Sequence, residues 1–141
     1  MTEPIRVLLV EDNAGDADLI RETLETGEFH LEIAVAVDGV QAISYLLRKP
    51  PYTHVELPDI VMLDLNLPKM SGQEVLAQIK LHSSLRAIPI VVLTSSDAEQ
   101  DIGKSYELGA NCYVTKPVGL AAFQSIIKAV ENFWLTVVKL P

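Results

Sequence analysis

The sequence contains a single cysteine, Cys112, among its 141 residues, which excludes a disulfide bond within the chain. It has no run of apolar residues close to the ~20 that a membrane-spanning helix needs. The first residues, MTEPIRVLLVEDN, carry one arginine, and their apolar run ends at acidic residues, which is not the pattern of a signal peptide. These absences favour a protein of the reducing cytoplasm with no membrane segment.

Positive charge is also scarce. Eleven Lys and Arg residues stand against nineteen Asp and Glu residues, and the formal net charge is −8. The basic residues are scattered, whereas nucleic-acid binding needs them clustered, so we expect no nucleic-acid partner. Four acidic residues do gather near the N-terminus: Glu11, Asp12, Asp16 and Asp18. The solvated start of a helix explains Asp16 and Asp18 well but Asp12 less well.

Apolar residues make up 49% of the chain, enough for one domain with a proper core. Segments with the pattern of strands alternate with segments of helical periodicity. The expected strands are 5–10, 31–37, 60–63, 88–93 and 112–114, and the expected helices are 14–26, 40–47, 72–81, 97–108 and 120–137. This alternation predicts an α/β fold in which helices cover both faces of a parallel sheet. The strand 31–37 alternates with period two, which indicates an edge of the sheet.

Polar side chains follow four of the expected strands at the point where each ends. Glu11 and Asp12 follow the first strand, Asp64 the third, Thr94 the fourth and Lys116 the fifth. Taken singly, each has a simpler explanation, such as a turn former, a helix cap or a surface lysine. Because the carboxyl ends of parallel strands meet at one edge of a sheet, the joint pattern predicts a functional site there.

Three carboxylates brought together repel one another and need positive charge to stay ionised. A lysine supplies one charge, and a hard divalent cation such as Mg²⁺ or Mn²⁺ supplies two more through oxygen ligands. No His or Cys stands at these strand ends, which disfavours zinc and iron. The set suits phosphoryl transfer, with Asp64 as the nucleophile and Asp12 and Glu11 as metal ligands.

Four motifs, VLLVEDN, PDIVMLDLNLPKMSG, IPIVVLTSS and YVTKP, occur in an order and spacing that resemble the receiver domain of two-component response regulators, over about residues 4–132. The resemblance implies a flavodoxin-like (βα)5 doubly wound three-layer fold with strand order 2-1-3-4-5. It implies that Asp64 takes a phosphoryl group from a sensor histidine kinase or a histidine phosphotransfer protein. Such a domain catalyses its own phosphorylation and dephosphorylation and is not a turnover enzyme.

The resemblance also implies a role for each residue near the metal. Asp12 corresponds to a direct Mg²⁺ ligand, and Glu11 to a ligand that acts through water. Asn66, two residues after Asp64, corresponds to the position that offers its backbone carbonyl to the metal.

The remaining motif residues are implied to bind and sense the phosphoryl group. Lys116 pairs with it, and the Lys116–Pro117 peptide bond is expected to be cis. Thr94 is the switch hydroxyl and Tyr113 the switch aromatic, and together they change the surface formed by the fourth helix, the fifth strand and the fifth helix. The alternative for Tyr113 is an ordinary half-buried aromatic residue of a strand.

Two further stretches, SYELGANCYVTKP and ENFWLTVVKLP, resemble single-domain regulators that are paired with bacterial and cyanobacterial phytochrome histidine kinases. We therefore expect residues 1–141 to form one receiver domain without an output domain, with 133–141 as an extended last helix and tail. The resemblance implies a homodimer through the fourth helix, fifth strand, fifth helix and tail. The fifth helix and the tail contain more apolar residues than one core-facing stripe needs, which agrees with a dimer interface. These residues are Leu120, Ile127, Trp134, Leu135 and Val138. The alternative is a tail that folds back on its own domain.

Two other functions share parts of this pattern. A phosphatase of the haloacid-dehalogenase type also forms an aspartyl phosphate, but it places a second Asp where this chain has Asn66. A binding module of the same fold, such as a degenerate receiver or a flavin protein, needs no phosphorylation. Against it, none of the acidic, hydroxyl and lysine residues is missing, and the acidic turn after the first strand would repel the phosphate of FMN.

Overall fold

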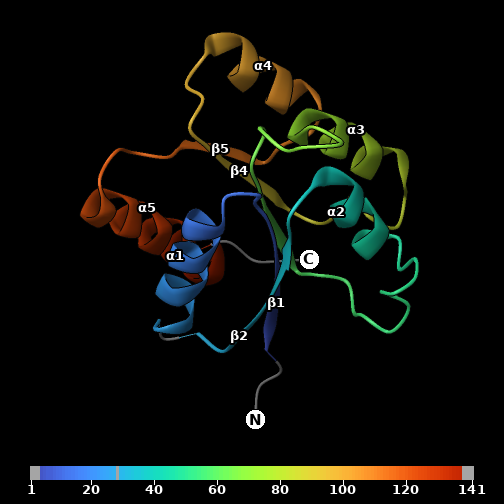
Figure 1. Ribbon diagram of the computed structural model, residues 1–141, viewed down its shortest axis with the longest axis horizontal. Coiled ribbons are helices and arrows are strands. Elements are labelled where there is room, and N and C mark those ends of the chain that lie inside the picture. The colour runs from blue at the N-terminus through green and yellow to red at the C-terminus, as the bar shows by residue number, and fades with distance from the viewer. Residues whose placement is uncertain (1–3, 28, 138–141) are drawn as a thin grey trace.

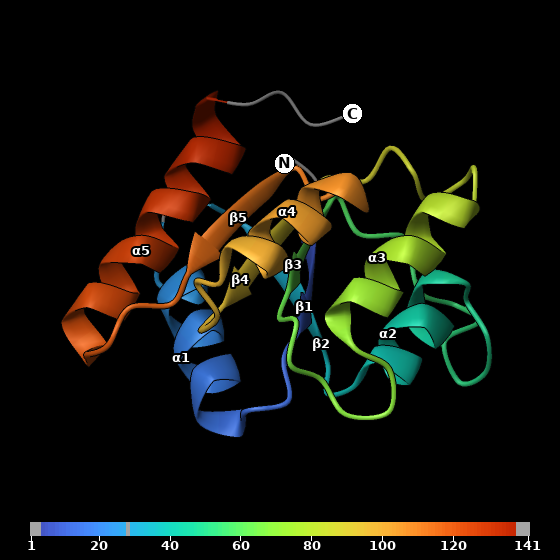
Figure 2. The same cartoon turned by 90° about the horizontal axis from the view of Figure 1, so that it is seen from above.

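The computed structural model describes residues 4–27 and 29–137. Within them, five parallel strands form one sheet that lies between two layers of helices (Figures 1 and 2). The strands are β1 (Ile5–Val10), β2 (Leu31–Ala36), β3 (Ile60–Leu63), β4 (Ile90–Thr94) and β5 (Cys112–Thr115). The helices are α1 (Ala14–Glu25), α2 (Gly39–Leu46), α3 (Gly72–Leu81), α4 (Glu99–Glu107) and α5 (Leu120–Asn132), followed by the π-helix η1 (Phe133–Val137). The strand order is β2-β1-β3-β4-β5, so the predicted fold class and order are confirmed.

The three central strands are buried on both faces, as their unbroken apolar sequences indicate. Alternate side chains of β1, β3 and β4 enter two separate cores. One core lies under α1 and α5 and the other under α2 and α3, and Figure 2 shows these pairs of helices on opposite sides of the sheet. Both faces of the sheet are therefore occupied by packing, which leaves the carboxyl edge of the strands for chemistry.

Three helices begin at this edge with a capping side chain. Asn13 accepts a hydrogen bond from the N–H of Asp16 at 2.9 Å at the start of α1, and Asp38 accepts one from Gln41 at 2.7 Å at the start of α2. Ser71 does the same for α3, with the N–H of Glu74 at 3.2 Å. Such caps satisfy backbone donors that the first turn of a helix leaves unpaired. They hold the loops that follow β1, β2 and β3 in defined positions.

The β3–α3 connection is so tightly packed that it has no room for a side chain at Gly72. A Cβ on Gly72 would overlap the carbonyl oxygen of Asp64 and the Cα of Leu65. The N–H of Gly72 donates to the carbonyl of Leu65 at 2.9 Å. This contact fixes the backbone on which the Asp64 side chain stands.

The C-terminal segment differs from the prediction of one continuous α-helix. The α-helix α5 ends at Asn132 and continues as the π-helix η1. The prediction that Ile127 is left over for an interface is wrong, because it is fully buried in the core under α1 and α5; Trp134 also packs into this core but still lines a groove beside β5. Leu135 is half-buried, Val138 lies outside the described residues, and Leu120 is exposed as expected. No helix in the described part of the chain is both long and apolar enough to cross a bilayer.

Candidate functional site

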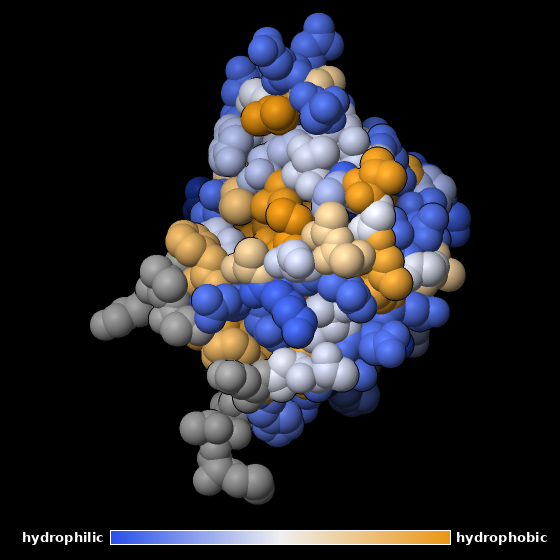
Figure 3. Space-filling view, turned by 90° about the vertical axis from the view of Figure 1, so that its left-hand side faces the viewer, coloured by the Kyte–Doolittle hydropathy of each residue, from blue (hydrophilic) through white to orange (hydrophobic). Residues whose placement is uncertain are grey.

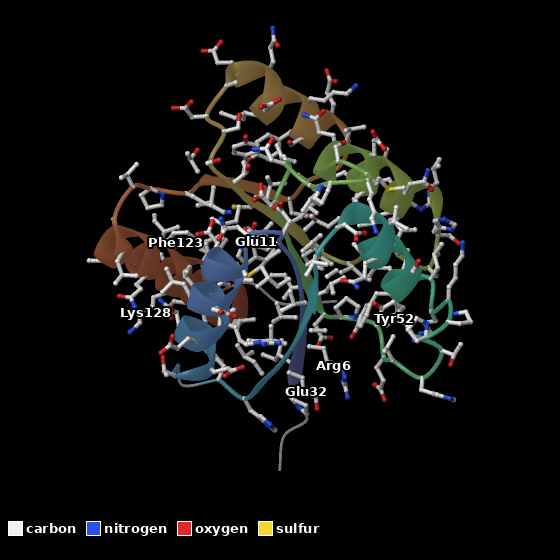
Figure 4. All side chains as sticks on the ribbon, in the orientation of Figure 1. Arg6, Glu11, Glu32, Tyr52, Phe123 and Lys128 are labelled. Atoms are coloured by element: carbon white, nitrogen blue, oxygen red, sulfur yellow. The ribbon has the colours of Figure 1, made fainter. Side chains whose placement is uncertain are left out.

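The residues predicted at the ends of β1, β3 and β5 meet at one point of the sheet edge. The ammonium nitrogen Nζ of Lys116 lies 3.0 Å from Oδ2 of Asp64 and 2.5 Å from Oε1 of Glu11. Figure 4 shows Glu11 at the end of β1, on the side of the molecule that carries α1 and α5. Lys116 has an exposed side-chain fraction of only 8%, and Glu11 and Asp64 are also buried. The lysine and both carboxylates thus interact with little screening by water.

A group of three carboxylates at this edge has the spacing of a cation site. One oxygen each from Glu11, Asp12 and Asp64 lies within 4.8 Å of the others, and Asp12 faces solvent. Asn66 donates its N–H to Oδ1 of Asp64 at 3.2 Å, which orients that carboxylate. The use of the Asn66 carbonyl as a ligand stays a prediction.

The hydroxyl of Thr94 lies at the end of β4 and is fully buried. Among the described residues it has no hydrogen-bond partner of ordinary geometry, although it is near enough to Asp64 to lower the pKa of that carboxyl. A buried hydroxyl without a well-aligned partner is suited to donate to a ligand oxygen that enters the site.

The two buried carboxyl groups have opposite pKa shifts. Burial raises the pKa of Asp64, but the Thr94 hydroxyl and the Lys116 ammonium outweigh it and hold the pKa below its ordinary value. Burial, together with the charge of Asp64, raises the pKa of Glu11 to about 7 against the partial compensation by Lys116. Asp64 is therefore ionised and able to act as a nucleophile at neutral pH.

One lysine does not neutralise this group of acids. Burial alone would lower the pKa of Lys116, but its bonds to Glu11, Asp16 and Asp64 raise it above the ordinary value. With Asp12 and Glu11 beside Asp64, negative charge remains in excess. The donor set is all oxygen and acidic, so the residues fit a hard divalent cation.

The raised pKa of Glu11 leads to a prediction of how the free energy of unfolding depends on pH when no divalent cation is present. Its pKa lies at about 7 in the folded protein and at 4.5 ordinarily, so between these values the folded chain binds a proton that the unfolded chain has lost. The pKa of its neighbour Lys116 is raised and that of Asp64 is lowered, so neither of these groups changes charge across this window. We expect the free energy of unfolding to fall by up to about 3 kcal/mol as pH rises from 4.5 to 7.

Denaturant unfolding in EDTA measures this dependence. A Glu11→Gln variant lacks the titrating carboxyl and should lose most of the slope. Added Mg²⁺ should raise stability more at pH 7 than at pH 5, because cation binding needs the ionised carboxylate. A wild-type stability that rises steadily from pH 4.5 to 7 in EDTA would contradict the prediction.

Asp16 is a member of this group that the sequence did not indicate. Its Oδ2 lies 3.0 Å from Nζ of Lys116, whereas its place among the acidic residues near the N-terminus predicts only the solvated start of a helix. It is the third residue of α1 after the cap Asn13, a position whose side chain can point back toward the preceding strand. That spacing is the signal by which the sequence could have suggested it.

Tyr113 is linked to the loop that follows Thr94. Its hydroxyl donates to the carbonyl of Ser96 at 2.7 Å, and its ring is half-buried beside the core under α2 and α3. The Ser96 hydroxyl donates to Asp101 of α4 at 2.5 Å. Movement of the β4–α4 loop would therefore displace side chains on both β5 and α4.

The Lys116–Pro117 bond is trans, so the prediction of a cis bond there is wrong; Pro50–Pro51 is the cis peptide among the described residues. The lysine reaches the site without it. Its N–H donates to the carbonyl of Thr94 at 2.7 Å, which continues the β4–β5 pairing, and its long side chain spans the remaining distance to the carboxylates.

Comparison with known proteins decides the family. The family model described as the response regulator receiver domain matches residues 7–128. The chain belongs to this family. It is 43% identical to the response regulator Rcp1 of Synechocystis sp. over 98% of this chain and 94% of Rcp1. It is similar to the crystal structure of the phosphorylated cyanobacterial phytochrome response regulator RcpA, with a TM-score of 0.96, 43% identity and 99% of each chain covered. It is also similar to the Mn²⁺-bound form of Rcp1, with a TM-score of 0.94, 43% identity, and 98% of this chain and 99% of that one covered.

The protein is thus a phosphoacceptor receiver domain of a two-component system and not a turnover enzyme. The predicted function is confirmed, and neither a haloacid-dehalogenase-type phosphatase nor a flavin module is needed to explain the site. The acidic group of Glu11, Asp12 and Asp64 is the metal pocket of the receiver domain. The protein's membership of this family implies that it has a cognate histidine kinase.

Proposed function

We propose that Asp64 accepts the phosphoryl group of a phosphohistidine, carried by a phytochrome-type sensor histidine kinase or a histidine phosphotransfer protein. A carboxylate oxygen of Asp64 attacks the phosphorus, an oxygen–phosphorus bond forms, and the phosphorus–nitrogen bond breaks. The imidazole leaves with the electron pair and takes up a proton. One observation carries this proposal above all: the Lys116 ammonium lies 3.0 Å from Asp64, with the unpaired Thr94 hydroxyl buried at the same edge.

The surrounding groups bind the transferred phosphoryl oxygens. Lys116 neutralises one of them, and the Thr94 hydroxyl donates a hydrogen bond to another. Glu11, Asp12, Asp64 and the carbonyl of Asn66 would hold a Mg²⁺ or Mn²⁺ ion, with Glu11 acting through water. That ion supplies positive charge against the charge on the phosphoryl group. Later attack of water on the phosphorus returns Asp64 to its free form.

Phosphorylation is proposed to change the surface formed by α4, β5 and α5. When Thr94 turns toward a phosphoryl oxygen, it moves the loop that contains Ser96. The hydroxyl of Tyr113 is bonded to this loop, so the ring must find a new position. The change spreads to α4 through the contact between Ser96 and Asp101.

The type of kinase is inferred from the relatives. Rcp1 and RcpA align with nearly the whole chain, and RcpA is named as a phytochrome response regulator. We expect a phosphorylated phytochrome-type kinase to transfer its label at least about tenfold faster than an unrelated histidine kinase, since both rates depend on fit at the docking surface. Equal rates would remove the phytochrome assignment, and no transfer from any kinase in Mg²⁺ would remove the proposed function itself.

A docking place for the kinase lies directly beside Lys116. A hollow of about 440 Å³ has both apolar and charged residues in its lining, among them Leu19, Val118, Leu120 and Phe123 together with Asp16 and Lys116. Val118 and Leu120 are exposed although they are apolar. Apolar residues at the mouth of a reactive site are suited to bind a partner that must approach it closely.

We further propose that the chain forms a homodimer through the α4–β5–α5 face. Figure 3 shows hydrophobic side chains gathered below the largely hydrophilic α4, over β5 and α5. A groove of about 190 Å³ there has an almost wholly apolar lining, made by Cys112, Val114, Ile126, Ala129, Val130, Phe133 and Trp134. A second copy of the same face would cover it, as an isologous interface requires.

A Phe133→Ser variant tests the dimer. Phe133 has an exposed fraction of 51% and forms one wall of the groove, so its loss should weaken self-association at least about tenfold. Sedimentation with and without beryllofluoride and Mg²⁺ measures this. Leu81→Ser is the matched control, because Leu81 is 75% exposed on α3 and should leave association unchanged. A monomeric wild type under both conditions would contradict the dimer.

The domain boundaries and cellular location are part of the same proposal. Residues 1–141 act as one receiver domain with its core in about 4–132, which agrees with a family match over 7–128. We place it in the cytoplasm because its kinase would draw phosphoryl groups from ATP there.

A further inference from the structure

Lys116 is shared by three carboxylates, and only two of them belong to the cation group. Its Nζ lies 2.5 Å from Glu11 and 3.0 Å from both Asp64 and Asp16. Glu11 and Asp64 also offer oxygens to the group of three that fits a metal ion, together with Asp12. Asp16 stands outside that group.

A divalent cation and the ammonium compete for the same two carboxylates. If Glu11 and Asp64 turn toward a cation, they have less negative charge to offer Lys116, and the two positive groups repel each other in a poorly solvated space. The lysine then needs another partner. Asp16 is the carboxylate already in contact with it, and its side chain is 33% exposed, against 8% for Lys116.

We propose that Asp16 is a positioning residue that holds Lys116 at the rim of the site while Glu11 and Asp64 bind the cation, and that it releases the lysine to the phosphoryl group. The inference rests on the proposed function of Asp64 as the phosphoacceptor. Asp16 does not contact the reacting atoms; it acts through Lys116.

The geometry suits this role because little movement is needed. Nζ is equally far from Asp16 and Asp64, so a small shift of a flexible side chain exchanges one for the other. The backbone of Asp16 is held in place, since its N–H is bound to the cap Asn13 at 2.9 Å. Asp16 and Lys116 both line the hollow beside the site.

The test is an Asp16→Asn variant, which removes the charge but keeps the shape. Free Mn²⁺ is followed by electron paramagnetic resonance, so the readout is metal binding and not activity. We expect Mn²⁺ affinity to fall about tenfold, the lower end of what loss of a residue that orients a metal site costs. Beryllofluoride binding at saturating Mg²⁺ should be unchanged or tighter, because the lysine no longer has to leave Asp16.

Asp18→Asn is the matched control. It removes the same charge from the same helix, but Asp18 is exposed, and residues two apart on a helix do not share a face. Its Mn²⁺ affinity should stay close to wild type. Asp16→Glu keeps the carboxylate and should retain most of the wild-type Mn²⁺ affinity. If Asp16→Asn folds poorly, this variant still tests whether a carboxylate at position 16 supports metal binding.

Two results overturn the inference. One is equal Mn²⁺ affinity of Asp16→Asn and Asp18→Asn. The other is a parallel loss of Mn²⁺ and beryllofluoride binding by Asp16→Asn. That result would mean that Asp16 is still needed after the phosphoryl mimic binds, and that it does not release Lys116. Both differ from failure of the proposed function, in which wild-type protein itself binds neither Mn²⁺ nor beryllofluoride.

Discussion

An Asp64→Asn protein is expected to accept no detectable label from a phosphorylated histidine kinase, while it remains folded. The amide of Asn lacks the negative charge and the nucleophilic oxygen that attack on phosphorus needs. The pKa of Asp64 is held below its ordinary value, chiefly by the Thr94 hydroxyl and by Lys116 acting against burial. The carboxyl of wild-type Asp64 is thus ionised when the kinase binds, whereas the amide of the variant carries no charge.

The fold should tolerate this change because Asn has nearly the shape of Asp. Lys116 keeps Glu11 and Asp16 as partners, and one charge leaves an acidic group that has an excess of negative charge. We expect the free energy of unfolding to change by no more than about 1 kcal/mol. Transfer of ³²P from the kinase in Mg²⁺, followed by gel electrophoresis, measures the label, and urea unfolding measures the fold.

Asp18→Asn serves as the control for this experiment too, since it removes the same charge from an exposed position. It should be labelled at the wild-type rate. Retention of hydroxylamine-sensitive label on Asp64→Asn would mean that another carboxylate is the phosphoacceptor, and the assignment of Asp64 would have to be abandoned.

A Lys116→Met protein is expected to lose both phosphoryl transfer and much of its stability, and only the stability should return with Mg²⁺. The ammonium is the shared partner of three carboxylates, of which Glu11 and Asp64 are buried. Removing one partner of a buried ion pair typically costs about 3–5 kcal/mol, because the other charges are left uncompensated. We take about 3 kcal/mol here, since Asp16 is partly solvated and Glu11 can take up a proton.

A cation would replace the missing charge but not the missing contact. Bound at the three carboxylates, it should restore most of the stability that EDTA-treated Lys116→Met lacks. The rate of phosphoryl transfer should stay about 100-fold or more below wild type, because loss of one donor to the transition state costs that much. Urea unfolding in EDTA and in Mg²⁺, beside the transfer rate, separates the two effects.

Lys128→Met provides the comparison, because Lys128 is an exposed lysine of α5 away from the carboxylates (Figure 4). It should change neither property measurably. If Lys116→Met were as stable as wild type in EDTA, the buried carboxylates would not depend on the lysine, and the electrostatic account of the site would be wrong.

The sequence alone was enough for the fold and for the strand-end residues of the site. Continuous apolar strands alternating with helical segments permit few architectures, and a parallel sheet brings the ends of β1, β3, β4 and β5 to one edge. Asp64 and Glu11 could therefore be assigned to one place from their positions alone. The motifs around them carried the resemblance to the receiver family.

Only the tertiary structure decided the features that depend on distance between elements. Asp16 looks like any acid at a helix start until α1 is packed beside α5, which brings it to Lys116 after the end of β5. Ile127 and Trp134 look like surplus apolar surface until the sheet and α1 cover them. Periodicity reports which way a side chain points from its own helix or strand, but contacts such as that of Asp16 with Lys116, 100 residues apart, are set by how the elements pack together.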